Sequence, residues 1–289
     1  MNAPHKLIIR KIPFDFDEDI APIWNTNKPE WSHMVNGASL TMPYLEPFLI
    51  RTMREAIGEI SDDALIEDAR GFIGQEGQHY QNHRAFNERL KANGYPELAH
   101  IEEQMAADYQ RFQNKSLKWR LAYSAGFETM TMGLTQWLVS QRRKLFAGAD
   151  PSVTSLVLWH MVEETEHKTV AFDVYQHLYG GYFARVRGVF DGSWHVMRYS
   201  HRGYKLMLKK DGRWWQLASR WRLLKMEASF LFNVGKLLLG AMLPGHHPDD
   251  ISDPDWVQQW SSAYRNLAED EIPLLDTNHP EIPARFGRG

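Results

Sequence analysis

Two short segments repeat one pattern of metal-binding side chains. In QEGQHYQNH, Glu76 is followed three residues later by His79, and in WHMVEETEH, Glu164 is followed by His167. Steps of three and four residues return to the same face of an α-helix, so each Glu-x-x-His pair points both side chains one way. His160 lies one turn before Glu164 and extends the second motif along that face. Together these residue types can hold a metal ion.

Two single acids fit the same scheme. Glu46 in PYLEPFLI and Glu128 in SAGFETMTMG each stand among apolar residues. One Glu from each of two helices, with Glu-x-x-His from each of two others, is how a ferritin-like bundle binds two metal ions. Cations would also offset the cost of burying four carboxylates together. The predicted ligands are Glu46, Glu76, His79, Glu128, His160, Glu164 and His167. The predicted cofactor is two metal ions, with iron favoured and manganese or zinc as alternatives.

Three neighbouring side chains are expected to orient ligands rather than to bind metal themselves. They are His83, Glu163 and Asp173. His83 lies on the same side of its helix as Glu76 and His79, so it could also be a ligand itself or an ordinary core histidine. On a helix, Glu163 and Glu166 would point in other directions than His160, Glu164 and His167, which is also compatible with a surface position. The pair His246 and His247 lies in PGHHPDD, where Pro and Gly favour a turn over a metal site.

Helical periodicity and end signals place the motifs on long helices. These are expected over 42–60, 61–95, 116–146 and 151–181, with a shorter connecting helix over 97–113. Glu46 stands at the start of its helix, where the helix dipole also favours a carboxylate, so Glu55 and Glu59 are alternative acids there. Further helices are expected at about 182–210, 213–243 and 255–268, and strand signals are few. The predicted fold class is all-α, a ferritin-like four-helix bundle with additional C-terminal helices.

The 289 residues, 43% of them hydrophobic, suffice for one large domain or a domain with an extension. We expect an irregular N-terminal arm over 1–41, the metal-binding bundle over 42–181, and a C-terminal helical extension over 182–289 packed on the bundle. The first 40 or so residues mix Pro, Asp, Asn and Trp without sustained periodicity, which favours irregular structure there.

Composition excludes several classes of function. The chain has no cysteine, which rules out disulfides, thiolate zinc sites, iron–sulfur clusters and a Cys nucleophile. A formal net charge of -3 without a long basic run gives no reason to expect nucleic acid as a partner. The N-terminus lacks the apolar region of a signal peptide, which predicts a cytoplasmic protein. The most apolar stretch, 226–244, is interrupted by Glu227, Asn233 and Lys236, so no transmembrane segment is expected.

The same segments resemble a known family. FIGQEGQHYQNHRAFN, LWHMVEETEHKTVAFDVY, SLTMPYLEPFLIRTMREA, SAGFETMT and PGHHPDD occur in the order found in the bacterial family named predicted metal-dependent hydrolases, over most of residues 8–250. The ligand pattern also resembles that of di-iron N-oxygenases of aromatic amines, where a His-x-x-x-Glu-x-x-His helix adds one His ligand. That resemblance carries onto His160, Glu164 and His167, with Glu76 and His79 as the partner motif and single acids at Glu46 and Glu128.

These resemblances suggest an enzyme, and the reaction that we expect from them is an oxidation. In that hypothesis two iron ions activate dioxygen to oxidise an apolar or aromatic small molecule, with Glu128 or Glu164 as the catalytic, metal-bridging residue. An external electron donor is then a possible partner, and a homodimer is also open. Two alternatives remain, namely a metal-dependent hydrolase that activates water with the same two metals, and a metal-binding bundle without turnover.

Overall fold

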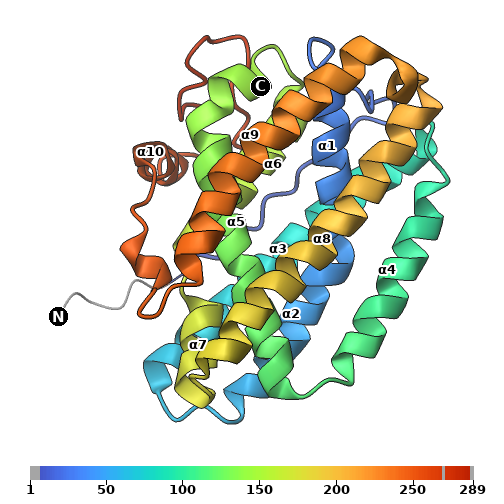
Figure 1. The fold of residues 1–289 in the computed structure, drawn as a ribbon. Coiled ribbons are helices and arrows are strands. Elements are labelled where there is room, and N and C mark those ends of the chain that lie inside the picture. Colours follow the sequence, from blue (N-terminus) through green and yellow to red (C-terminus); the bar gives the residue numbers. More distant parts are fainter. Residues whose placement is uncertain (1–6, 269–270, 287–289) are drawn as a thin grey trace.

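Apolar residues at helical spacing form helices throughout the part of the chain that the structure describes. The computed structural model describes residues 7–268 and 271–286, and within them the fold is all-α, as predicted (Figure 1). An antiparallel bridge between Leu275 and Phe286 is the only β-pairing in those residues. The helices are α1 (Pro29–Ser39), α2 (Met42–Ile57), α3 (Asp63–Ala92), α4 (Leu98–Gln113), α5 (Leu117–Phe146), α6 (Pro151–Glu166), α7 (Val170–Leu178), α8 (Tyr182–Lys210), α9 (Leu217–Ala241) and α10 (Asp255–Tyr264).

Helices α2, α3, α5 and α6 form the bundle that surrounds the predicted ligands. Helix α2 packs along α3, and α5 packs against α6 and α7. One hydrophobic core runs through these helices and reaches both the N-terminal arm and α10. Within the arm, Phe14 packs on Trp159 and Phe16 packs on Phe86. The division into arm, bundle and extension stays a prediction, and residues 1–6, 269–270 and 287–289 of the first and third parts lie outside the described residues.

The arm is more regular than predicted. Residues 29–39 form α1, which begins at Pro29 and lies against α8. Proline is well tolerated in the first turn of a helix, because the N–H that it lacks would have no intrahelical partner there. The sequence of α1 has no simple apolar repeat, since both apolar and polar side chains of this helix are buried. Tertiary packing, rather than periodicity, therefore stabilises this helix.

A second difference concerns the segment 151–181, which was expected to be one helix. The helix α6 ends at Glu166 and α7 begins at Val170. Between them His167 leaves helical geometry, with φ -106° and ψ 14°, while its backbone N–H still bonds to the carbonyl of Glu163. The prediction of a continuous helix was wrong here, and His167 lies in the break, at the C-terminus of α6.

Proline inside α2 is accommodated by a neighbouring helix. Pro47 cannot donate a backbone hydrogen bond to the carbonyl of Pro43, one turn earlier. The side chain of Arg84 on α3 donates to that carbonyl instead, at 3.3 Å. The turn of α2 that carries Glu46 is thus tied to α3.

Helices α8 and α9 both lie at the front of the bundle in Figure 1 and are joined through the short turn Arg213–Trp215. Both pack on α5. The approach of α8 to α5 is close because Gly126 and Gly188 face each other, and a Cβ added at either would overlap backbone atoms of the opposite helix. Within the described residues, no helix is both long enough and apolar enough to span a bilayer.

We predict that Gly188→Ala destabilises the protein by about 1–3 kcal/mol, the usual cost of overpacking a tight contact. The added methyl group would meet the backbone of Ala122, which cannot move without shifting α5. The measurement is the free energy of unfolding in urea. Gly235→Ala on α9 is the matched control, because a Cβ there meets no atom within 4 Å. This control should stabilise slightly, by up to about 1 kcal/mol, and equal effects of the two substitutions would contradict the prediction.

Candidate metal centre

The bundle brings all seven predicted ligands together in its interior. Each of them is at most 3% exposed. Their ligand atoms form two groups, and within each group the atoms lie within 4.8 Å of one another. The first group is Glu46, His79 and His160, and the second is Glu76, Glu128, Glu164 and His167. Four helices and the break after α6 supply these side chains, so the site exists only once the bundle has assembled.

The carboxylate of Glu164 connects the two groups. Its Oε1 lies 2.8 Å from Nε2 of His160 and 3.7 Å from Nδ1 of His79, both in the first group. Its Oε2 lies 3.3 Å from Nε2 of His167, in the second group. A carboxylate whose two oxygens face two separate donor sets has the geometry of a bridging ligand.

The break after α6 positions His167. Its Nε2 lies 3.3 Å from Glu76 Oε1 and 3.6 Å from Glu128 Oε2. On the other side of the ring, Nδ1 donates to the side-chain oxygen of Gln75 at 2.9 Å. The amide nitrogen of Gln75 donates in turn to Glu166 at 2.9 Å, which fixes the amide orientation. The hydrogen on Nδ1 therefore leaves Nε2 as the atom available to a metal.

A second outer contact orients His79. Its Nε2 donates to Glu163 Oε2 at 2.9 Å, and the other oxygen of Glu163 accepts from Arg10 at 2.9 Å. Arg10 also forms a two-pronged ion pair with Glu166, at 2.7 and 2.6 Å. This arrangement leaves Nδ1 of His79 free to face Glu164. Carboxylates that hold the far nitrogen of a histidine are a recurrent feature of metal sites.

The third histidine of the cluster is held by a chain of hydrogen bonds. Nδ1 of His160 lies 2.7 Å from Nε2 of His83, and Nδ1 of His83 lies 2.8 Å from the hydroxyl of Ser39. The hydroxyl of Ser39 donates to Asn87 at 2.7 Å, so it accepts from His83. The ring of His83 then accepts from Nδ1 of His160, and Nε2 of His160 offers its lone pair to the cluster.

The cluster has more acceptors than the described protein atoms can satisfy. Both oxygens of Glu46, Glu76 and Glu128 are buried without a hydrogen-bond partner among the described residues, as is Nδ1 of His79. Buried polar atoms are normally paired, because an unpaired one costs about 1–3 kcal/mol. Divalent cations would satisfy these atoms and their charge, so the donor set fits a pair of metal ions bound by oxygen and imidazole.

Burial shifts the protonation of these groups. It raises the pKa of Glu46 and Glu76 well above the usual range, and the charge of Glu164 adds to the effect. The same two causes raise the pKa of Glu128 to about 8. Burial lowers the pKa of His79 well below that of a free histidine, so its ring is neutral. Without metal, protons therefore occupy the carboxylates that a cation would bind.

His167 and Glu164 behave differently because they attract each other. Burial by itself would lower the pKa of His167, but the charge of Glu164 beside it raises this pKa well above the usual range. Burial would likewise raise the pKa of Glu164, but His167 holds it well below the usual range. A metal ion would displace the proton on Nε2 of His167.

Not every predicted residue reaches the cluster. Asp173 on α7 pairs with His247 at 2.8 Å instead of orienting a ligand, so that expectation was wrong, as the break before α7 redirects the helix. Of the two histidines in PGHHPDD, His247 is thus the partner of Asp173, outside the cluster. On α2, Glu55 pairs with Arg120 at 2.7 Å, whereas Glu59 is exposed in the turn after this helix. Among the acids of that helix, Glu46 is the one in the cluster.

The structure also adds residues that the spacing did not indicate. They are Arg10, Ser39, Gln75 and Asn87, all of which support histidines of the cluster through the contacts above. Gln75 directly precedes Glu76, so its place beside the site could have been noticed. Arg10 and Ser39 precede the bundle in sequence, and nothing local to them indicates contact with the site.

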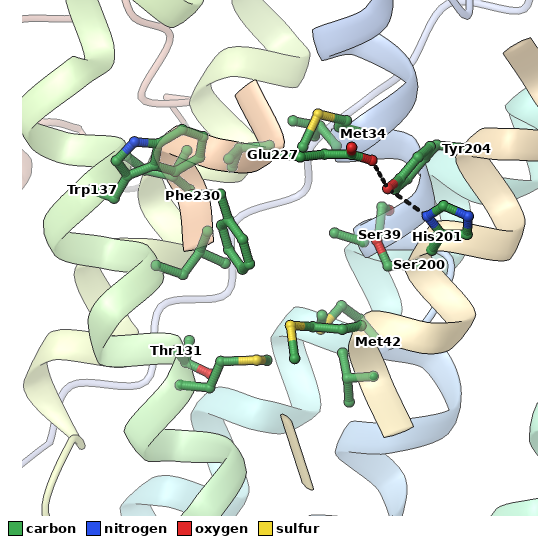
Figure 2. A pocket seen from close by; sticks show the side chains of 18 of the residues that line it. Met34, Ser39, Met42, Thr131, Trp137, Ser200, His201, Tyr204, Glu227 and Phe230 are labelled. Carbon is green, nitrogen blue, oxygen red and sulfur yellow. Dashed lines mark hydrogen bonds between the residues drawn. The ribbon is translucent and has the colours of Figure 1, made fainter. Parts of the chain in front are cut away.

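A cavity of about 600 Å³ opens beside the cluster. His83 and His160 form part of its wall, and most of the remaining wall is apolar. Figure 2 shows Trp137 and Phe230 along the cavity. The figure also shows the hydroxyl of Tyr204 donating to Glu227, at 2.6 Å, and lying 2.7 Å from His201. The cavity is therefore a largely apolar space, with polar side chains such as Arg202, Tyr204 and Glu227 in part of its wall and His83 and His160 in the wall beside the cluster.

We predict that Gln75→Leu weakens metal binding about 10–100-fold, the usual effect of removing an outer partner of a ligand. Leucine keeps the volume of the side chain but removes the acceptor for His167 and the donor to Glu166. Metal affinity is measured by competition with a chelating dye. Gln81→Leu on the same helix is the control, because Gln81 is exposed and bonds only to the backbone of Gly77 among the described residues. Unchanged affinity in Gln75→Leu would refute this role.

Metal binding should also depend on pH, since the ion competes with protons on Glu128 and His167. Between pH 6.5 and 7.5 we expect the affinity to rise about tenfold for each proton displaced. The sign follows from the pKa of Glu128 near 8, below which this carboxyl is mostly protonated in the metal-free protein. Glu128→Gln removes one titrating group, so its affinity should be lower and should change less with pH. Equal affinities at the two pH values for the unsubstituted protein would contradict this prediction.

Comparison with known proteins bears on the chemistry. A family model described as predicted metal-dependent hydrolase matches residues 8–252. No curated protein and no solved structure matches the chain. The family description contradicts the oxidative hypothesis, in which di-iron chemistry activates dioxygen with electrons from an external donor, and it favours the hydrolytic alternative. The donor set alone could not separate the two, because oxygen and imidazole ligands serve both kinds of metal chemistry. With most of its length matched, this chain belongs to the family of predicted metal-dependent hydrolases.

Proposed function

We propose that the protein is a hydrolase that uses two divalent metal ions held by the bundle. The observation that carries the proposal is the convergence of seven buried side chains that can bind metal, six of which have at least one polar atom without a hydrogen-bond partner among the described residues. Membership of a family of predicted metal-dependent hydrolases supports the hydrolytic form of the chemistry. The ligands are Glu46, Glu76, His79, Glu128, His160, Glu164 and His167. Zinc, manganese and iron(II) all suit this donor set.

Bound metal would lower the pKa of a water molecule and polarise the bond to be cleaved. Glu164 would help to hold both metal ions, since its two oxygens face the two groups of ligands. His79, His160 and His167 each present one nitrogen to the cluster while their other nitrogen is hydrogen-bonded. These outer bonds hold the rings in place. His83 is neutral, because burial lowers its pKa, and its Nε2 holds Nδ1 of His160 from the side of the cavity.

The cavity favours a substrate with an apolar group. Its wall is largely apolar, and it meets the cluster at His160. An apolar chain in this space would place the bond to be cleaved near Glu46 and His160. The proposed substrate class is an ester or amide of an apolar acid, with water adding across the acyl bond to give the free acid and an alcohol or amine. The apolar wall would also keep competing water away from the metals.

The proposal is tested by loading metal-free protein with zinc, manganese or iron(II), and assaying nitrophenyl esters of acetate, butyrate and octanoate. We expect hydrolysis only in the loaded protein, with kcat/KM rising from acetate to octanoate as the chain fills the cavity. Glu164→Gln should lower kcat/KM by more than about a hundredfold, beyond the usual loss from an outer contact.

Glu103→Gln provides the control for this experiment. Its side chain is 78% exposed on α4, so the same chemical change should leave hydrolysis unaltered. The proposal fails if protein with both metals bound hydrolyses no ester, amide or phosphate ester above the metal-free rate. That result would favour a metal-binding bundle without turnover.

A further inference from the structure

The α8–α9 face of the molecule exposes an unusual amount of apolar surface. Of the large hydrophobic side chains that are exposed in the described residues, all but Ile8 and Ile9 lie between 182 and 243. Scattered apolar residues are normal at a surface, but a cluster of this kind marks a contact site. They are Tyr182, Phe183, Phe190, Trp194, Trp215, Leu217, Trp221, Leu224, Leu231, Phe232, Leu239 and Leu243.

Helical spacing gathers these side chains into a face. On α9, Leu217, Trp221 and Leu224 follow one another at steps of four and three, and Leu231 lies two turns further on. These side chains are 52–88% exposed, so they point away from the core. Helices α8 and α9 both lie at the front of the bundle in Figure 1.

The same segment is strongly basic. Residues 182–243 contain twelve Lys or Arg and three Asp or Glu, a formal net charge of +9 in a chain whose net charge is -3. Several of the cations lie beside exposed aromatic rings. Lys225 lies 5.1 Å from the ring of Trp221, and Lys209 lies 5.8 Å from that of Trp215. Others are paired within the protein, such as Arg222 with Glu30.

The cavity beside the metal centre opens on this face. Trp194 of α8 and Leu231 of α9 both line the cavity, and they are 68% and 59% exposed. The mouth of the cavity therefore lies between the two helices, bordered by apolar side chains. A molecule that entered there would come from whatever covers the α8–α9 face.

We infer that the α8–α9 face docks on the surface of an anionic lipid bilayer. Helices that combine Trp, Phe and Leu with Lys and Arg lie in the interface of such bilayers, with the apolar groups in the acyl region and the cations at the headgroups. A second copy of the chain fits less well, because a symmetric dimer would bring two faces of the same positive charge together. The inference concerns the surface of the chain and does not require the metal centre to turn over substrate.

The test is cosedimentation of the full chain with vesicles of phosphatidylcholine, alone or mixed with an equal part of phosphatidylglycerol. We expect binding to the mixed vesicles that weakens with salt, and little binding to phosphatidylcholine. Lys225→Gln with Lys236→Gln should lower the partition coefficient about thirtyfold, because each cation near the surface contributes about 1 kcal/mol. Trp221→Ser with Phe232→Ser should lower it about a hundredfold through lost apolar burial.

Lys115→Gln with Lys144→Gln is the matched control, since both lysines are exposed but lie outside the α8–α9 face. This variant should bind as the unsubstituted protein does. Absence of binding to anionic vesicles would overturn the inference. So would a dimer, measured by sedimentation equilibrium, that does not bind vesicles and that Trp221→Ser with Phe232→Ser dissociates. Neither result would bear on metal-dependent hydrolysis in solution, which the ester assay decides separately.

Discussion

Four carboxylates meet in the interior of the bundle without a lysine or arginine among the described residues to balance them. Among the described residues, Glu46, Glu76, Glu128 and Glu164 make no ion pair with any lysine or arginine. Arg10 contacts Glu163 and Glu166, which are not among these four carboxylates. Burying four negative charges without compensation costs a large free energy. Protons or metal ions must therefore supply the compensating positive charge. The outer hydrogen bonds of His79, His160 and His167 hold one nitrogen of each ring directed toward the carboxylates.

The sequence predicted the centre of this site better than its surroundings. Glu76, His79, Glu164 and His167 could be predicted as ligands because helical spacing is periodic and is visible in the sequence, whereas Glu46 and Glu128 were predicted as single acids among apolar residues. The break at His167 was missed because no glycine or proline marks it, and Asp173 was misplaced as a result. Arg10 and Ser39 were missed for another reason: their contacts join positions far apart in the chain, and only the assembled fold brings them together.

The ligand residues alone do not determine whether a dinuclear metal site is oxidative or hydrolytic. Carboxylates and imidazoles define a place for two cations, but they do not define whether those ions exchange electrons or activate water. That difference depends on the metal, on the substrate and on what can reach the site. In this chain the apolar wall of the cavity and its mouth between α8 and α9 would limit which molecules reach the predicted ligands. Access to the predicted ligands therefore depends on α8 and α9 as well as on the four helices that carry these residues.

The contact of Arg10 with Glu163 has a consequence for the order in which the chain folds. The two residues are 153 positions apart, whereas all seven ligands fall between 46 and 167. Closing so long a loop costs entropy that only an already formed binding surface can offset. We expect the arm to dock last, after the four helices have assembled, which leaves a period in which ions can enter from the side that Arg10 later closes. Pulse-labelling hydrogen exchange during refolding would show late protection at residues 8–16 if this order holds, and early protection there would rule it out.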